Sequence, residues 1–161
     1  MVILSSAETF SLFSFAVFSL YDLRFRLAPA IEVFLLAAAV LACWTTPPLQ
    51  VIMVIFAVLW GLGDWLPGWL PVILFFHPAT WPILIIGAGV RRELIGRADL
   101  MALGGIACIF PWPALVFSIL GFEFWRRWWV SRHNDGPIPA IPGLFLGLAV
   151  FVVGRALLSL Y

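Results

Sequence analysis

The sequence predicts an all-α integral membrane protein with about six transmembrane helices and an N-terminus outside the cell. Mean hydropathy is +1.11, and 64% of the residues are hydrophobic while only 11% are charged. Soluble domains carry roughly 25% charged residues, so this composition excludes an ordinary soluble fold. Long apolar runs alternate with proline breaks and arginine clusters, as expected of a chain that crosses a bilayer repeatedly. At 161 residues we expect a single polytopic domain, residues 1–161, with no separate soluble domain.

The first third of the chain predicts two spans. The first apolar run covers about residues 2–21. Because no basic segment precedes it and Glu8 comes early, it predicts a first span and not a cleavable signal peptide. A second apolar run covers about residues 29–44 and ends at the break Thr45-Thr46-Pro47-Pro48.

The remaining spans are less regular. The region 49–90 is apolar but broken by glycines and prolines, and we expect one crossing and a re-entrant or interfacial piece there. Three further apolar runs cover about residues 100–110, 114–124 and 138–158. The first two of these are short, since a helix needs about 20 residues to cross a bilayer. We therefore expect them to tilt or to lie where the membrane is thin.

The arginines set the predicted topology. Eight of the nine fall in three clusters, at residues 24–26, 91–97 and 126–132. Short cytoplasmic loops are enriched in basic residues, so we place all three clusters in the cytoplasm. The result is a multi-pass protein of the plasma membrane whose general partner is the lipid bilayer. A net charge of +1 provides no broad positive field, so no nucleic acid is expected as a partner.

Two aspartates lie at predicted helix ends. Asp22 closes the first apolar run, and Asp99 opens a later one. An acidic residue within a membrane segment costs free energy, about 2.5–3.5 kcal/mol at a helix centre, and is a functional candidate by default. In the predicted topology both helix ends are cytoplasmic, so the two carboxylates are expected at the same depth and able to approach one another. The ordinary alternatives are an ion pair of Asp22 with Arg24 or Arg26 and a helix cap or first-turn role for Asp99.

A carboxylate pair predicts acid–base chemistry. Two carboxyl groups a few Å apart do not both ionise cheaply, so one acts as an acid while the other acts as a base on a water. Such a dyad hydrolyses a peptide bond without a metal ion or a covalent intermediate. No metal or cofactor is expected, because Cys43 and Cys108 lie in apolar runs and His77 and His133 are far apart in the sequence.

Two segments resemble known motifs. Asp22-Leu23-Arg24-Phe25-Arg26-Leu27-Ala28-Pro29 is similar to D-x-R-x-R-x-x-P, and Gly96-Arg97-Ala98-Asp99 is similar to G-x-G-D or G-x-A-D. These are motifs of the type IV prepilin and preflagellin peptidases, the GxGD intramembrane aspartic proteases. Arg126-Arg127 and the proline-rich residues 137–142 also fit that family. The sequence departs from it at Ala28-Pro29-Ala30, where Ile-Pro-Asn is usual, at Ala98, where glycine is usual, and at Met101, where lysine is frequent.

The resemblance implies an aspartic-type endopeptidase that processes signal peptides. Its substrate would be a pilin-like or archaellin-like precursor, cut on the cytoplasmic side to remove a short basic leader. Asp22 and Asp99 would activate water and protonate the leaving amine, while Gly96 and Ala98 would let the substrate strand approach. The N-terminal domain with cysteine pairs that bacterial members use for N-methylation is not expected, so the resemblance implies cleavage without methylation.

Several alternatives stay open. Gly61-Leu62-Gly63-Asp64 matches GxGD literally, but Asp64 follows Asp22 by only 42 residues and no basic residues flank it. We therefore prefer Asp99. Glu32 and Glu123 would either bind the basic leader or pair with arginines. The chain could instead be a non-catalytic or degenerate membrane scaffold or, as a third hypothesis, a proton-coupled transporter.

Overall fold

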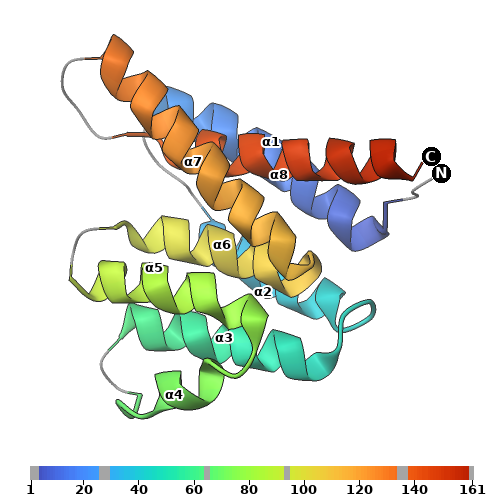
Figure 1. Ribbon diagram of the computed structural model, residues 1–161, viewed down its shortest axis with the longest axis vertical. Helices are drawn as coiled ribbons and strands as arrows, with labels where there is room; N and C mark the ends of the chain where they lie inside the picture. Colours follow the sequence, from blue (N-terminus) through green and yellow to red (C-terminus); the bar gives the residue numbers. More distant parts are fainter. Residues whose placement is uncertain (1–3, 26–29, 64–65, 93–94, 134–137, 160–161) are drawn as a thin grey trace. The chain divides into compact units, whose positions relative to one another are not determined.

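The computed structural model describes residues 4–25, 30–63, 66–92, 95–133 and 138–159. Every regular element within these residues is helical, which confirms an all-α fold. The helices group into two compact units (Figure 1). Unit 1 comprises Met1–Pro29 and Pro113–Tyr161, and unit 2 comprises Ala30–Trp112. The prediction of a single domain over the whole chain stays a prediction.

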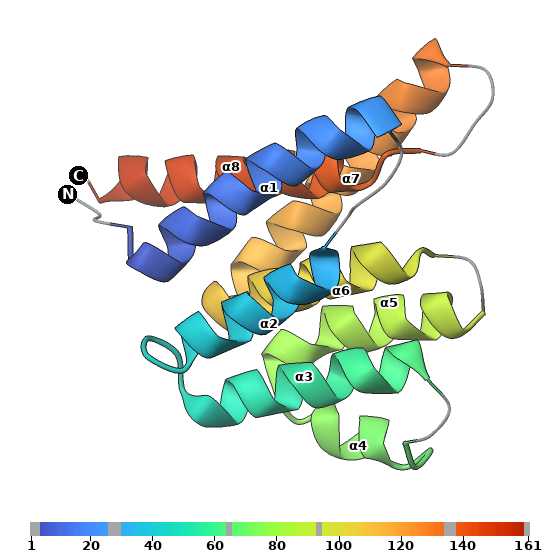
Figure 2. The same cartoon turned by 180° about the vertical axis from the view of Figure 1, so that it is seen from behind.

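Unit 1 contains α1 (Ser6–Phe25), α7 (Trp112–Arg132) and α8 (Ile141–Leu158). α1 and α8 pack against each other and run antiparallel (Figure 2). α1 begins with a capping box, in which the Ser5 backbone N–H donates to Glu8 Oε2 at 2.8 Å and the Glu8 N–H donates to Ser5 Oγ at 3.1 Å. This reciprocal pair satisfies two amides that a helix start otherwise leaves unbonded.

Glycines bring α7 and α8 into backbone contact. A Cβ on Gly121 would collide with the backbone of Gly147, and a Cβ on Gly147 would collide with the carbonyl oxygen of Phe117. A Cβ on Gly143 would lie 2.7 Å from the Cα of Phe122. Only glycine permits this spacing, since backbone atoms cannot turn aside as a side chain can.

Two helices of unit 1 extend beyond the apolar runs from which they were predicted. α1 continues past the run at residues 2–21 to Phe25, so Asp22 lies in its last turns. α7 continues past the run at residues 114–124 and through the basic cluster to Arg132. Glu123 bonds Arg126 and Arg127, three and four residues further on, and such pairs support a helix beyond its apolar part.

Unit 2 is built around one buried helix. It contains α2 (Ile31–Ala42), α3 (Pro48–Leu62), α5 (Trp81–Arg91) and α6 (Arg97–Ile109), with the short α4 (Leu70–Leu74) and η1 (Pro78–Thr80). α6 packs against α2, α3 and α5, and nearly all of it from Leu100 onward is buried. Small residues allow this packing: a Cβ on Gly104 would meet Val58 Cγ2 at 2.6 Å, and one on Gly105 would overlap the Phe34 ring.

The packing contacts fix the helix directions in unit 2. Gly61, near the end of α3, touches Gly87, near the end of α5, so these two helices are parallel. Gly61 also lies beside Leu100 at the start of α6, whereas Gln50 Nε2 at the start of α3 donates to Ala107 O at the end of α6, at 3.0 Å. α6 is therefore antiparallel to α3 and α5. The region 49–90 thus starts at one end of unit 2 and finishes at the opposite end. A segment that crosses a membrane an odd number of times must have this arrangement.

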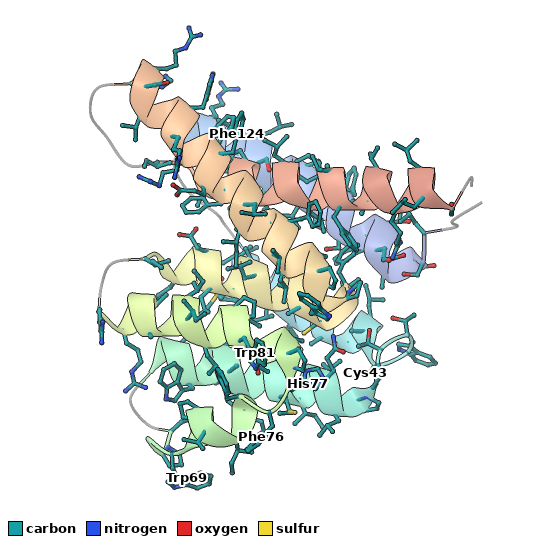
Figure 3. The ribbon with its side chains drawn as sticks, viewed as in Figure 1. Cys43, Trp69, Phe76, His77, Trp81 and Phe124 are labelled. Carbon is teal, nitrogen blue, oxygen red and sulfur yellow. The ribbon has the colours of Figure 1, made fainter. Side chains whose placement is uncertain are left out.

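In the segment between α3 and α5, several backbone carbonyls accept hydrogen bonds from nearby side chains. Thr80 is fully buried, and its hydroxyl donates to the carbonyls of Leu74 and His77. Trp81 Nε1 donates to Phe75 O at 2.5 Å. These bonds give the buried Thr80 hydroxyl and the carbonyls around it partners that buried polar groups require. Figure 3 shows Phe76 and Trp69 of this segment, both of which are largely exposed.

Among the described residues, α8 is the one helix long and apolar enough to cross a membrane. α2 and α3 are shorter apolar helices. Six crossings, the outside N-terminus and a multi-pass location therefore stay predictions.

Candidate functional site

Asp22 lies on the buried face of α1, near its C-terminal end, and is 8% exposed. Its Oδ2 accepts a hydrogen bond of 3.2 Å from the backbone N–H of Ile141, the first residue of α8. Ala140, the N-cap residue of α8, makes no side-chain capping hydrogen bond. The Asp22 carboxylate, which belongs to α1, caps this helix start instead. A negative charge is stabilised at this position because a helix N-terminus carries partial positive charge. Of its two predicted partners, Arg26 lies outside the described residues.

α1 has an inverted distribution of polarity. Its exposed face carries Phe13 and Leu20, each 70% exposed. A helix in water shows the opposite arrangement, with apolar residues inside. Four of its six buried residues are polar, and from Glu8 onward they recur at steps of three or four: Ala7, Glu8, Ser11, Phe15, Ser19 and Asp22.

The other end of the α1–α8 pair carries an ion pair. Glu8 Oε1 lies 2.7 Å from Arg155 Nη2, and the Glu8 side chain is only 11% exposed. Arg155 is the arginine outside the three clusters, and its place in the sequence predicts no role for it. The capping-box pattern Ser5-x-x-Glu8 was a readable signal for the helix start, but nothing local indicated Arg155. Glu8 and Asp22 are fourteen residues apart, as are Ile141 and Arg155, so two polar contacts bracket the antiparallel pair.

Asp99 lies in the first turn of α6, in unit 2, and is half-buried. This confirms the expected first-turn position, where the helix dipole favours an acid. Gly96 is the N-cap with φ −70° and ψ 147°, a conformation open to any residue. Glycine is useful there for space, because a Cβ would lie 3.2 Å from Asp99 Oδ2. Ala98 adds only a methyl group to the same turn, and the role of both small residues toward a substrate stays a prediction.

The rival Asp64 lies outside the described residues, but the preceding glycines do not. No basic residue flanks this motif in the sequence, but the fold brings Arg91 beside it. Arg91 Nη1 donates to Trp60 O at 3.2 Å and to Gly63 O at 3.5 Å. The cause is the parallel arrangement of α3 and α5, which brings the C-terminal ends of both helices together beside the start of α6.

A cavity of 420 Å³ opens at this end of unit 2. Its walls are Gly61–Gly63 at the end of α3, Val90 and Arg91 of α5, Ile95 before α6, and Arg97 at the start of α6. The guanidinium of Arg91 lies 4.9 Å from the Trp60 ring centre, a cation–π contact. The sequence predicts these arginines at the membrane surface but does not predict a cavity, since α3 and α5 meet only in the folded unit.

The segment after Asp22 enters unit 2 through a strained residue. Ala30 has φ 56° and ψ 23°, the left-handed region, and it is the non-glycine residue with positive φ among those described. Asparagine and glycine adopt this region more readily than alanine. Ala30 is also the position at which the resemblance leads one to expect asparagine.

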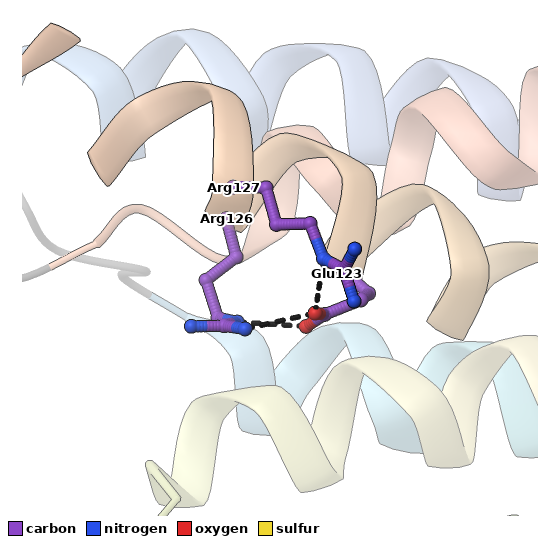
Figure 4. A network of polar contacts seen from close by, with 3 residues as sticks. All are labelled: Glu123, Arg126 and Arg127. Atoms are coloured by element: carbon purple, nitrogen blue, oxygen red, sulfur yellow. Dashed lines mark hydrogen bonds and ion pairs between the residues drawn. The ribbon is translucent and has the colours of Figure 1, made fainter. Parts of the chain in front are cut away.

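Two further acids among the described residues, Glu123 and Glu32, lie at the surface. Glu123 accepts from Arg126 Nε at 2.7 Å and from Arg127 Nε at 2.8 Å (Figure 4). This confirms the arginine-paired interpretation, and a pair this exposed contributes little to stability. Glu32 is exposed in the first turn of α2. The described residues contain no cluster of three or more His, Cys, Asp and Glu side chains able to hold a metal ion.

No family model, curated protein or solved structure matches the chain. The functional assignment therefore depends on the chemistry of the residues and on the motif resemblance alone.

Proposed function

We propose that this chain is an intramembrane aspartic endopeptidase that removes the short leader of pilin-like or archaellin-like precursors. It would cross the plasma membrane about six times, with the N-terminus outside. Asp22 and Asp99 would act together, one carboxylate activating a water and the other protonating the leaving amine. The proposal requires the two carboxylates to meet, and it needs no metal or cofactor.

The inverted polarity of α1 carries the proposal. A helix that buries Asp22, Ser11 and Ser19 while exposing Phe13 and Leu20 suits a lipid surrounding and a polar interior. Ionisable residues inside such a helix face the protein interior and are functional by default, since lipid exposure would cost them free energy.

Exposed apolar side chains on other helices support the membrane location. Leu36 on α2 is 66% exposed, and Ile85 on α5 is 70% exposed. Leu120 on α7 and Val153 on α8 are likewise exposed. Soluble proteins rarely display apolar surface this widely, whereas in lipid such faces carry no penalty.

The test is cleavage of a pilin-like precursor by the purified chain in detergent. Asp22→Asn and Asp99→Asn should each lower the rate by at least about a hundredfold, the low end for losing one acid–base group. The Asp64→Asn variant should cleave the precursor at the wild-type rate. Thermal unfolding of each variant, measured on the same preparations, separates lost chemistry from lost fold.

Retained cleavage in Asp99→Asn would remove Asp99 from the site. If Asp64→Asn were inactive instead, the aspartic chemistry would survive and the second carboxylate would be Asp64. No cleavage of any precursor by the wild-type chain would reject the peptidase.

A non-catalytic membrane protein is the second candidate, and one contact favours it. The Asp22–Ile141 hydrogen bond gives Asp22 a structural purpose without any reaction. On this alternative, Asp22→Asn lowers the unfolding temperature while no precursor is cleaved by the wild-type chain.

A further inference from the structure

Among the described residues, three buried side-chain polar atoms have no hydrogen-bond partner, and two of them belong to the α1–α8 pair. These two are Ser11 Oγ and Arg155 Nε, and the third is Trp125 Nε1 on α7. Folded proteins pair nearly all of their buried polar groups, because an unsatisfied group costs free energy. Two such atoms on two helices that pack together need a common explanation.

The capping box explains the unpaired donor of Arg155. Glu8 binds the Arg155 guanidinium through Oε1, which lies 2.7 Å from Nη2. Its other oxygen, Oε2, accepts the Ser5 backbone N–H at 2.8 Å. Glu123 is not shared in this way, and its two oxygens accept from Nε and Nη2 of Arg126 at 2.7 and 2.8 Å (Figure 4). Because Glu8 also caps α1, the Arg155 Nε–H has no second carboxylate oxygen to bind.

Ser11 differs from the other buried serines among the described residues. The hydroxyls of Ser19 and Ser118 donate to the carbonyl four residues earlier in their own helix, at 2.6 and 2.9 Å. Ser11 is fully buried as well, but its hydroxyl makes no such bond to Ala7. Ser11 lies on the same buried face of α1 as Glu8, one turn further along. Its unbonded hydroxyl is therefore close to the Glu8–Arg155 ion pair.

The charges around these two atoms favour a neutral ligand. The Arg155 guanidinium would repel a cation, and the Glu8 carboxylate would repel an anion. The ligand must also accept from an N–H and bond a hydroxyl, and it must be small because both atoms are enclosed. Water meets all of these requirements.

We infer that a water molecule is bound between α1 and α8, where it accepts from Arg155 Nε–H and donates to Ser11 Oγ. Residues one turn apart have Cβ atoms about 5–6 Å apart, and a water with two hydrogen bonds joins atoms about 5 Å apart. Glu8 offers a third partner, since each carboxylate oxygen accepts more than one hydrogen bond. Buried waters typically make about three. The inference concerns the end of α1 remote from Asp22, so it does not depend on the peptidase proposal.

The first test is the sign of the stability change in Ser11→Ala, measured as the melting temperature of the full chain in detergent. With the water bound, the variant loses a hydrogen bond and should melt about 3 °C lower. Without it, the variant loses only an unsatisfied buried hydroxyl and should melt higher. Ser19→Ala is the matched control, because Ser19 lies on the same face of α1 and its hydroxyl is already bonded to Phe15 O. An unchanged or raised melting temperature in Ser11→Ala, or a loss no larger than in Ser19→Ala, would overturn the inference.

The second test detects the water directly, by solid-state NMR of the ¹⁵N-labelled chain in bilayers. Proton polarisation should pass from water to the Arg155 Nε–H, whose signal is assigned by its loss in Arg155→Lys. Arg127 is the positive control, since its side chain is 77% exposed. The transfer to Arg155 should weaken in Ser11→Ala and stay unchanged in Ser19→Ala. Transfer to Arg127 without transfer to Arg155, or equal transfer to Arg155 in Ser11→Ala and the wild type, would contradict a water held by both residues.

Discussion

The two units hold their helices together by different means. In unit 1, α1 and α8 are joined by polar contacts at both ends: Glu8 with Arg155, and Asp22 with the first amide of α8. In unit 2, α6 is surrounded through small residues and apolar side chains, and Arg91 and Arg97 line a cavity beside its start. Buried charged groups therefore join the helix pair α1–α8 in unit 1, whereas the helix contacts around α6 in unit 2 are made by small and apolar residues.

This difference suggests distinct roles for the two aspartates. Asp22 is buried and already bonded, so it is well placed to be held rigidly and costly to move. Asp99 is half-buried beside Gly96 and near an open cavity, so it is the more accessible of the two. If the chain is a peptidase, Asp99 is the carboxylate that a substrate would meet first.

The largest stability effect should come from the glycine contacts of unit 1. Gly147→Ala should destabilise the protein by about 3 kcal/mol, the upper range for overpacking, because its Cβ meets the carbonyl oxygen of Phe117. Gly154→Ala on the same helix is the control, since nothing lies within 4 Å of its Cβ. It should be neutral or slightly stabilising. Chemical unfolding in detergent measures both, and equal effects would contradict the close α7–α8 contact.

The ion pair of unit 1 should have the next largest effect. Glu8→Gln should cost about 2 kcal/mol, less than a fully buried pair because the Arg155 side chain is 29% exposed. Glu8→Gln together with Arg155→Gln should recover part of this loss, since no charge is then left buried alone. A double-mutant cycle by chemical unfolding checks the coupling. Additive losses would show that the two residues do not pair.

The smallest effect should arise at the entry to unit 2. Ala30→Gly should stabilise the protein by about 0.5 kcal/mol, because relief of left-handed strain slightly exceeds the added freedom of the unfolded chain. Ala30→Val should destabilise it, since a β-branched residue resists positive φ. A thermal melt of both variants gives the signs, and a stabilising valine would be inconsistent with φ 56° at this position.

What the sequence predicted well was local. The all-helical class and the first-turn position of Asp99 followed from composition and from the residues adjoining one helix start. The apolar run at residues 114–124 marks only part of α7. The pairs of Glu123 with Arg126 and Arg127, three and four residues further on, were a local signal that the helix continues past this run. The Glu8–Arg155 pair joins residues 147 positions apart, and the cavity needs α3 and α5 to be parallel. No sequence period encodes either feature, since both arise only when separate helices pack.

The measurement that tests the proposed dyad most directly is cross-linking of Asp22→Cys to Asp99→Cys in native membranes. Cys43 and Cys108 would first be replaced by alanine, and a short bifunctional thiol reagent would be added. The peptidase proposal predicts an efficient cross-link between positions 22 and 99 and none between Glu8→Cys and Asp99→Cys, since Glu8 is at the other end of α1. Absence of a 22–99 cross-link, with both thiols shown to be reactive, would contradict a shared catalytic site.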